Sequence, residues 1–288
     1  MAISGEGRIL DPYIVENYTD FKTVLQGEGT YWTNNQVIYI RLEGNVSSST
    51  WENMTNGDHF CKPNINLNDY SLNMGDNSLT GTALPLYTQL QNGRVNNDNK
   101  NLSSITMNNV RMVSNGVTFM GCKWYNSKLQ IGLGFTSSRT RLFAQTVFEC
   151  CDVSLNLTLT GARAEKVFYG RGWTTVNPSY AYRSRFKGKI SGVFNYNNNN
   201  YFLADGQSAS SLFAFYESVI NVDLSDVADI SNHGSIMRCD SILSYINTDT
   251  LPTNLTADNM TNLTTAQITN GAYLRSVGFP VLNEVITP

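Results

Sequence analysis

Charge and histidine are scarce in this sequence, and both scarcities narrow the functions open to it. Only 15% of the 288 residues are charged, and the formal net charge is −3. A protein whose main role is to bind nucleic acid needs a positively charged surface that contacts the phosphates, so we predict no nucleic-acid partner. Neither of the 2 histidines, His59 and His233, stands in a recognisable triad setting. A Gly-x-Ser-x-Gly elbow and a Walker glycine loop are absent as well.

An export signal and long apolar runs are also missing. The opening residues Met1 to Gly7 have neither a basic n-region nor an apolar h-region. No stretch approaches the roughly 18 consecutive apolar residues of a membrane span. We therefore expect a soluble protein made in a cytosol, with no membrane insertion.

The 5 cysteines contain no CxxC spacing. Three of them, Cys122, Cys150 and Cys239, occupy similar places in the repeat described below, so we expect them to stack inside the fold as small apolar side chains. Zinc binding is the less favoured alternative, because the histidines are remote from these cysteines in sequence. No metal and no cofactor are predicted.

A repeated sequence shape runs from about residue 105 to residue 247. Each copy has an aromatic residue or Met, two or three small, polar or Cys residues, and then alternating apolar residues. The copies begin at Met120, Phe148, Phe186, Phe215 and Met237. The intervals are 28, 38, 29 and 22 residues (148−120, 186−148, 215−186 and 237−215). Such a period is typical of a solenoid, so the sequence predicts an all-β fold, a single-stranded parallel β-helix.

Four regions are expected along the chain. Residues 1–46 form an N-terminal cap, in which Thr19 or Asp20 begins a short helix ending near Gln26, followed by a first strand at 37–42. Residues 47–103 are polar and rich in turn-forming residues, so we expect irregular, loop-rich early layers there. Residues 104–247 hold the regular repeats, and residues 248–288 form a linker and a C-terminal cap.

Both expected caps resemble those of a known class of proteins. Gly5-x-Gly7, Asp11-Pro-Tyr-Ile-Val15 and Asn17-Tyr-Thr-Asp-Phe21 resemble the N-terminal cap of right-handed parallel β-helix proteins. Such caps occur in tail appendages and head fibres of tailed phages and in bacterial surface proteins. The segment from Thr264 to Val281, with Tyr273-Leu-x-x-x-Gly-Phe279, is similar to their closing element, although Ile268 replaces a frequent Met.

The resemblance implies a structural role in a virion. We expect a non-enzymatic head or tail appendage or fibre that takes part in particle assembly or host attachment. Its partners would be other virion proteins, further copies of itself in a homotrimer, and a host surface glycan.

Aromatic residues near a basic island are the predicted contact surface. The residues expected to bind are Trp173, Tyr180, Tyr182, Tyr196 and Tyr201. The cations of the island are Arg163, Lys166, Arg171, Arg183, Arg185, Lys187 and Lys189. Together they suit a polyanion or an acidic glycan. A solvated face or a subunit interface is the more conservative interpretation.

Two other functions stay open at this point. A tailspike-type glycan depolymerase or lyase needs two carboxylates at about 5–10 Å. The candidates are Glu149 with Asp152, Glu217 with Asp223, and the set Asp223, Asp226 and Asp229. Each adjoins an apolar strand residue, as expected of an outward polar position, so no catalytic residue is assigned. The third function, a bacterial surface adhesin, would need an export route.

Overall fold

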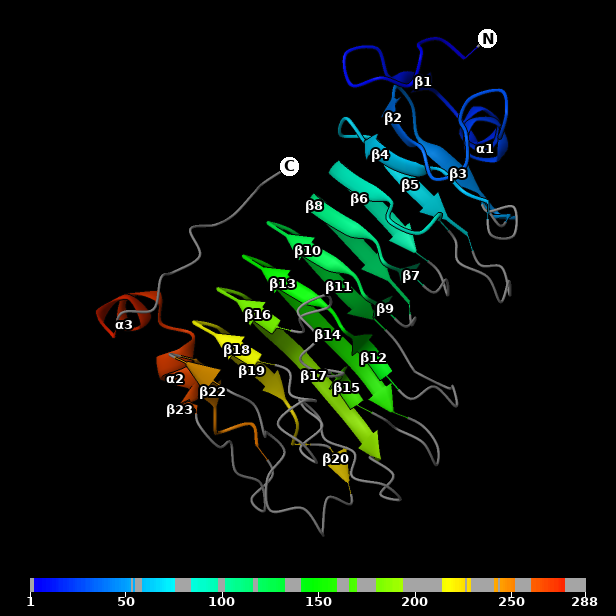
Figure 1. Cartoon of the computed structure of the whole chain (residues 1–288). Helices are drawn as coiled ribbons and strands as arrows, with labels where there is room; N and C mark the ends of the chain where they lie inside the picture. The colour runs from blue at the N-terminus through cyan, green and yellow to red at the C-terminus, as the bar shows by residue number, and fades with distance from the viewer. Residues whose placement is uncertain are drawn as a thin grey trace. The chain divides into compact units, whose positions relative to one another are not determined.

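The computed structural model is mainly β, and the strand ladders that it describes are parallel (Figure 1). It describes residues 3–52, 54, 59–75, 84–97, 102–115, 119–132, 141–159, 166–169, 180–193, 214–225, 227–228, 241–242, 244–251 and 260–277. The chain divides into two compact units, Met1–Lys128 and Leu129–Thr287. The expectation of an all-β, parallel fold is confirmed.

The first unit opens with strand β1 (Tyr13–Val15) and helix α1 (Tyr18–Gln26). The predicted apolar face of the helix is confirmed, because Phe21, Val24 and Leu25 are all buried. The predicted cap is wrong. Asn17 is the N-cap, since its side-chain oxygen accepts a hydrogen bond from the Asp20 backbone N–H at 3.0 Å.

Parallel strands then stack in successive layers of the first unit, where one layer is the step from a residue to its register partner on the next strand. One ladder contains β1, β2 (Val37–Leu42), β4 (Lys62–Asn66), β6 (Gln89–Asn97), β8 (Thr106–Ser114) and β10 (Lys123–Tyr125). Strand β3 (Val46–Ser48) pairs with β5 (Ser71–Met74), and β7 (Leu102–Ser103) pairs with β9 (Phe119–Met120). The strand predicted at 37–42 is confirmed as β2.

A column of apolar side chains forms the core of these layers. Ile40, Ile65, Leu90, Met107 and Trp124 are successive register partners, and all are buried. The layers shorten along the chain, because the step from β2 to its partner positions on β4 spans more of the sequence than the step from β6 to β8.

Residues 47–103 are more regular than their composition indicates. Strands β4, β5, β6 and β7 lie within this range, where irregular, loop-rich early layers were expected. The reason is that buried and outward residues alternate in β4 and β5, so Asn fills the outward positions without breaking the strand.

The second unit continues with the same parallel arrangement. Strands β13 (Val147–Glu149), β16 (Tyr180–Tyr182), β18 (Ala214–Tyr216) and β21 (Ser241–Ile242) form one ladder. Strands β14 (Asp152–Leu159), β17 (Arg185–Val193), β19 (Val219–Asp223), β22 (Tyr245–Asn247) and β23 (Thr261–Leu263) form another. Strand β11 (Lys128–Gly132) begins at the boundary, β12 (Arg141–Ala144) pairs with β15 (Lys166–Tyr169), and β20 (Val227–Ala228) pairs with the end of β17.

The register corrects the alignment of the sequence repeats. Phe148 and Phe215 are both register partners of Ala181, so these two copies are equivalent. Phe186 instead pairs with Val153 and Ile220, further along the layer than Ala181. The register was misjudged because an alanine stands where the neighbouring layers carry phenylalanine. The start of the fifth copy, Met237, lies beyond the residues described here.

Phenylalanine rings stack through the interior of the second unit. The centroids of Phe148 and Phe186 are 5.5 Å apart with an interplanar angle of 89°, and those of Phe186 and Phe215 are 5.7 Å apart at 83°. All three rings are buried. This edge-to-face geometry is the favourable one for aromatic pairs, and it links three successive layers through the core.

Three layers of the second unit turn a corner at a residue with positive φ that is followed by a small side chain. In the second unit the corner residues are Cys150, Arg183 and Glu217, with φ of 55°, 47° and 46°. The side chains that follow are those of Cys151, Ser184 and Ser218, and all three are buried. Ser184 Oγ accepts a hydrogen bond from the Cys151 backbone N–H at 3.1 Å. These bonds satisfy buried backbone donors where the ladder is interrupted.

The expectation that Cys122, Cys150 and Cys239 stack in the interior agrees with the structure for Cys122 but not for Cys150. Cys122 is buried, but Cys150 is half-buried at a corner, and its neighbour Cys151 takes the interior position. Cys239 lies outside the described part of the chain. The adjacent pair could not be told apart by sequence, because either cysteine suits a small interior position.

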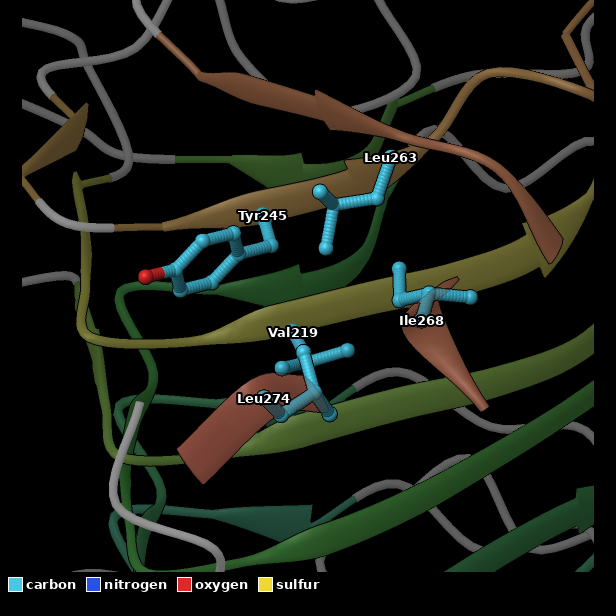
Figure 2. Packing of buried hydrophobic residues seen from close by; sticks show 5 residues of the cluster. All are labelled: Val219, Tyr245, Leu263, Ile268 and Leu274. Carbon is cyan, nitrogen blue, oxygen red and sulfur yellow. The ribbon is translucent and has the colours of Figure 1, made fainter. Parts of the chain in front are cut away.

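Two short helices, α2 (Thr265–Ile268) and α3 (Gly271–Ser276), follow the last strand of the second unit. Figure 2 shows Ile268 and Leu274 beside Val219, Tyr245 and Leu263, and these five residues form one buried cluster. Thr264 and Gln267 form a reciprocal capping box at the start of α2. The helices thus cover apolar side chains of the final layers. None of the helices among the described residues has the length and apolarity of a membrane span.

Candidate functional site

Two of the five predicted binding residues, Tyr180 and Tyr182, lie in the described part of the chain. They occupy alternate positions of β16, and both side chains are half-buried while Ala181 between them is buried. They therefore share the outward face of the strand. Trp173, Tyr196 and Tyr201 fall outside the described residues, so the structure does not place them.

A third tyrosine joins this face from the next layer. Tyr216 is the register partner of Tyr182, and its ring centroid lies 6.3 Å from that of Tyr180. On the preceding layer, Glu149 is the partner of Tyr182 and accepts a hydrogen bond from the Tyr180 hydroxyl. Three layers thus contribute to one cluster, which we call the tyrosine cluster: Glu149, Tyr180, Tyr182, Arg183, Tyr216 and Glu217.

An ion pair orders one edge of the tyrosine cluster. The Arg183 guanidinium lies 5.0 Å from the centroid of the Tyr182 ring, and its Nε lies 2.6 Å from Glu217 Oε2. Arg183 and Glu217 are corner residues of adjacent layers, so the backbone places their side chains side by side. The cluster thus presents aromatic rings beside one neutralised ion pair, Arg183 with Glu217, and beside the Glu149 carboxylate that Tyr180 binds.

The described part of the basic island is largely neutralised too. Arg185 and Lys187 both bind Asp152 Oδ2, at 2.7 Å and 3.1 Å, and Lys189 lies 3.8 Å from Asp223. These carboxylates come from the layers on either side of β17. The island is therefore no continuous cationic surface here, which weakens the hypothesis of a polyanion site on it. Arg163 and Arg171 lie beyond the residues described.

The candidate carboxylates are engaged by partners instead of sharing a cleft as an acid and a base. Burial raises the pKa of Asp152, but Arg185 and Lys187 outweigh it and hold that pKa below its usual range. The hydrogen bond from the Ser225 hydroxyl, opposed by burial and assisted by Lys189, lowers the pKa of Asp223. A general acid needs a raised pKa, so both shifts run in the wrong direction for that role. Asp226 and Asp229 fall outside the described residues.

The thiols of Cys61 and Cys122 are buried and lack the environment of a reactive cysteine. Burial raises the pKa of Cys61 and of Cys122 to about 12, far from the depressed values of nucleophilic cysteines. Within the described ranges, no three His, Cys, Asp or Glu side chains come together as metal ligands. His59 lies at the surface, where its Nδ1 is 2.9 Å from Glu28 Oε1.

Sequence reasoning missed Tyr216 as a member of the cluster. A local signal was present, because Tyr182-Arg-Ser184 and Tyr216-Glu-Ser218 have the same spacing. In both, the tyrosine precedes a corner residue and the serine follows it. Aligning the chain on this Tyr-x-Ser pattern instead of on the leading aromatic residue would have placed the two tyrosines on neighbouring layers.

Comparison with known proteins gives no relative for this chain: no family model, no curated protein and no solved structure matches it.

Proposed function

We propose that this chain is a right-handed parallel β-helix that acts as a non-enzymatic structural component of a phage virion, in a head or tail appendage or fibre. It would help to assemble the particle or attach it to the host surface. Its partners would be other virion proteins, a host glycan, and further copies of the chain in a homotrimer. The trimer and the virion rest on the resemblance of the two terminal segments to phage caps.

The β-helix part of the proposal is supported by the regular register. Partner residues in each ladder follow one another after 16 to 35 positions, as in Tyr245 with Thr261 (261−245) and Gly192 with Val227 (227−192). Parallel neighbours need a crossover between them, and such crossovers are right-handed in nearly all proteins. A stack of short crossovers with one hand gives a right-handed solenoid.

The contacts of the candidate carboxylates support the proposal that the protein is non-enzymatic. Each described candidate is bound to a partner: Glu149 to Tyr180, Glu217 to Arg183, Asp152 to Arg185 and Lys187, and Asp223 to Ser225 and Lys189. These contacts stabilise the stacking of layers. The tyrosine cluster, in contrast, offers aromatic surface suited to docking a partner without chemistry.

The test is to incubate the purified chain with capsular and cell-wall polysaccharides and to measure both binding and release of new reducing ends. We expect no release. Release that disappears in the double variant Asp223→Asn, Asp226→Asn would overturn the proposal in favour of a glycan depolymerase. A mass near three chains by analytical ultracentrifugation is expected, and a monomer at all concentrations would remove the trimer from the proposal.

The particle or cell fraction in which the protein is found distinguishes a virion component from a bacterial surface adhesin. A virion component is expected in purified phage particles detected by mass spectrometry. Recovery only from the envelope of uninfected bacteria would favour the surface adhesin.

A further inference from the structure

Tyr87, in the first unit, combines an unfavourable backbone with an exposed aromatic ring. Its φ is +65°, a region that bulky residues rarely occupy, and 57% of the residue is exposed. The Tyr87 backbone N–H donates to the Ser104 carbonyl at 3.0 Å, and Ser104 and Gly121 have positive φ at the next two corners. The corner thus needs a residue that tolerates positive φ, and Asn or Gly would meet that need without exposing an aromatic ring. Strain at an exposed residue is characteristic of functional positions.

The ring of Tyr87 is held in place on the surface. The Lys62 Nζ lies 5.5 Å from its centroid, and the Phe60 ring centroid lies 6.4 Å away at an interplanar angle of 32°. The Lys62 ammonium lies over one face of the Tyr87 ring, and Phe60 flanks that ring from the adjacent layer. The surface of Tyr87 that stays exposed is therefore a preorganised aromatic platform next to a cation. Tyrosine provides such a surface at a low cost in conformational entropy.

Beside this platform lies a face made of amides and lysines, which we call the amide face: Lys62, Asn64, Gln89, Gln91, Asn108 and Lys123. These residues point outward from β4, β6, β8 and β10. Asn64 donates to Gln89 at 3.3 Å and accepts from Gln91 at 3.2 Å, so the amides are ordered across layers. Each amide can make more hydrogen bonds than these, and they suit hydroxyl or acetamido groups.

The positive charge of the amide face indicates an anionic ligand. No carboxylate stands at an outward position of β4, β8, β10 or the first three residues of β6. Among the described residues, neither Lys62 nor Lys123 forms an ion pair, whereas Arg41 on the neighbouring β2 is paired with Glu43 at 2.7 Å. Three strand spacings separate the layers of Lys62 and Lys123, about 14 Å. A linear polyanion lying across the strands would meet both cations.

We infer that the amide face and Tyr87 bind an acidic polysaccharide. A sugar ring would stack on Tyr87, sugar hydroxyls would bond to the amides, and carboxylate or phosphate groups would pair with Lys62 and Lys123. The inference extends the proposed attachment function to a site outside the tyrosine cluster. It is independent of whether the chain forms part of a virion.

The experiment uses the full chain and immobilised polygalacturonate, hyaluronan and teichoic acid, with neutral dextran as the reference. Wild type is expected to bind at least one anionic polymer at least tenfold more tightly than dextran, and less tightly as salt rises. Tyr87→Asn is expected to weaken that binding about tenfold or more, and Tyr87→Phe to retain it. The double variant Lys62→Ala, Lys123→Ala should lose the preference over dextran.

A stability measurement separates binding from a structural role. Asn tolerates positive φ, so Tyr87→Asn should leave the Tm unchanged or raise it by about 2–4 °C. A lower Tm for this variant would overturn the inference, because Tyr87 would then serve the fold. The matched control Lys22→Ala, on α1, should leave polyanion binding by the amide face unchanged. Tyr182→Ala is measured beside it as the test of the alternative site, the tyrosine cluster.

The outcomes distinguish this site from the wider proposal. Wild type that binds none of the three anionic polymers overturns the inference and leaves the assembly role of the proposed function in place. Binding that is lost in Tyr182→Ala but kept in Tyr87→Asn supports attachment and overturns this site. A change in oligomeric mass caused by Tyr87→Asn would show that the amide face binds a second copy of the chain. That result would overturn the inference that this face binds a polysaccharide.

Discussion

The Ser218 hydroxyl accepts a hydrogen bond from the backbone N–H of Ser184, 3.2 Å away on the preceding layer. It also donates to the Tyr216 carbonyl at 2.9 Å, and the Ser218 backbone N–H in turn donates to Ser244 Oγ at 3.1 Å. All three serines are buried. The corners are thereby joined by side chains where backbone pairing alone would leave donors unsatisfied.

Ser218→Ala should therefore destabilise the protein. The change leaves the buried Ser184 N–H without its hydrogen-bond acceptor, whereas the Tyr216 carbonyl keeps the hydrogen bond from the Arg183 backbone N–H at 3.0 Å. We therefore expect a loss of about 1–3 kcal/mol in the free energy of unfolding. Ser218→Cys should cost less, because Cys151 occupies the equivalent position and its Sγ contacts the Glu149 carbonyl at 3.3 Å. Urea unfolding followed by circular dichroism measures both.

Ser47→Ala is the control for that experiment, since Ser47 is an exposed residue of β3. It should change the free energy of unfolding by less than about 0.5 kcal/mol. Equal effects of the two Ser→Ala changes would refute the role of the buried serines.

Gly188 is predicted to be irreplaceable within β17. Its φ is +113°, and a Cβ there would stand 2.1 Å from the Leu155 carbonyl oxygen of the preceding layer. Gly188→Ala should lower the free energy of unfolding by at least about 2 kcal/mol, through both strain and the clash with backbone. Gly29→Ala is the matched control, because its φ is +80° but nothing lies within 4 Å of the added Cβ. It should cost only the strain, and a larger loss there than at Gly188 would contradict the steric argument.

The Asp152 ion pairs predict a defined loss of stability in acid. The folded-state pKa of Asp152 is below its usual value, so the carboxylate stabilises the fold above the unfolded pKa of about 3.9. That contribution disappears as the pH falls through the lower, folded pKa. Asp152→Asn should cost about 1–2 kcal/mol at neutral pH, and its difference from wild type should shrink below about pH 4.

Unfolding by denaturant at a series of pH values tests this prediction. Glu16→Gln, at an exposed position, is the control and should show a small difference with little pH dependence. A difference between Asp152→Asn and wild type that grows toward acid would reverse the sign and exclude the stabilising ion pairs.

Cys61 and Cys122 should resist alkylation in the native protein. Burial raises the pKa of both thiols to about 12, so at pH 8 almost none is present as the reactive thiolate. Cys150 is half-buried and should react before them, although burial raises its pKa as well. Iodoacetamide labelling read by peptide mass spectrometry gives the order. Labelling of Cys122 as rapid in native protein as in denaturant would show that the interior position is wrong.

The sequence by itself determined the class of fold and the faces of the elements. Alternation of apolar and polar residues is a local property, so β2 and the buried face of α1 could be read from the chain. The repeated small residues after an aromatic one indicated stacked layers. The scarcity of charge agreed with a fold whose side chains form ladders.

Only the tertiary structure decided the register and the partners. Phe186 and Phe215 look equivalent in sequence, yet they lie at different positions of the layer, because layer length varies and an alanine interrupts the aromatic column. The same long-range pairing joins Arg183 to Glu217 and Asp152 to Arg185, although a whole layer of sequence separates the members of each pair. Within the described part of the chain, Asp152, Glu217 and Asp223 thus form ion pairs with cations of the predicted basic island. Contacts across such separations depend on how many residues each crossover contains, and no local pattern specifies that number.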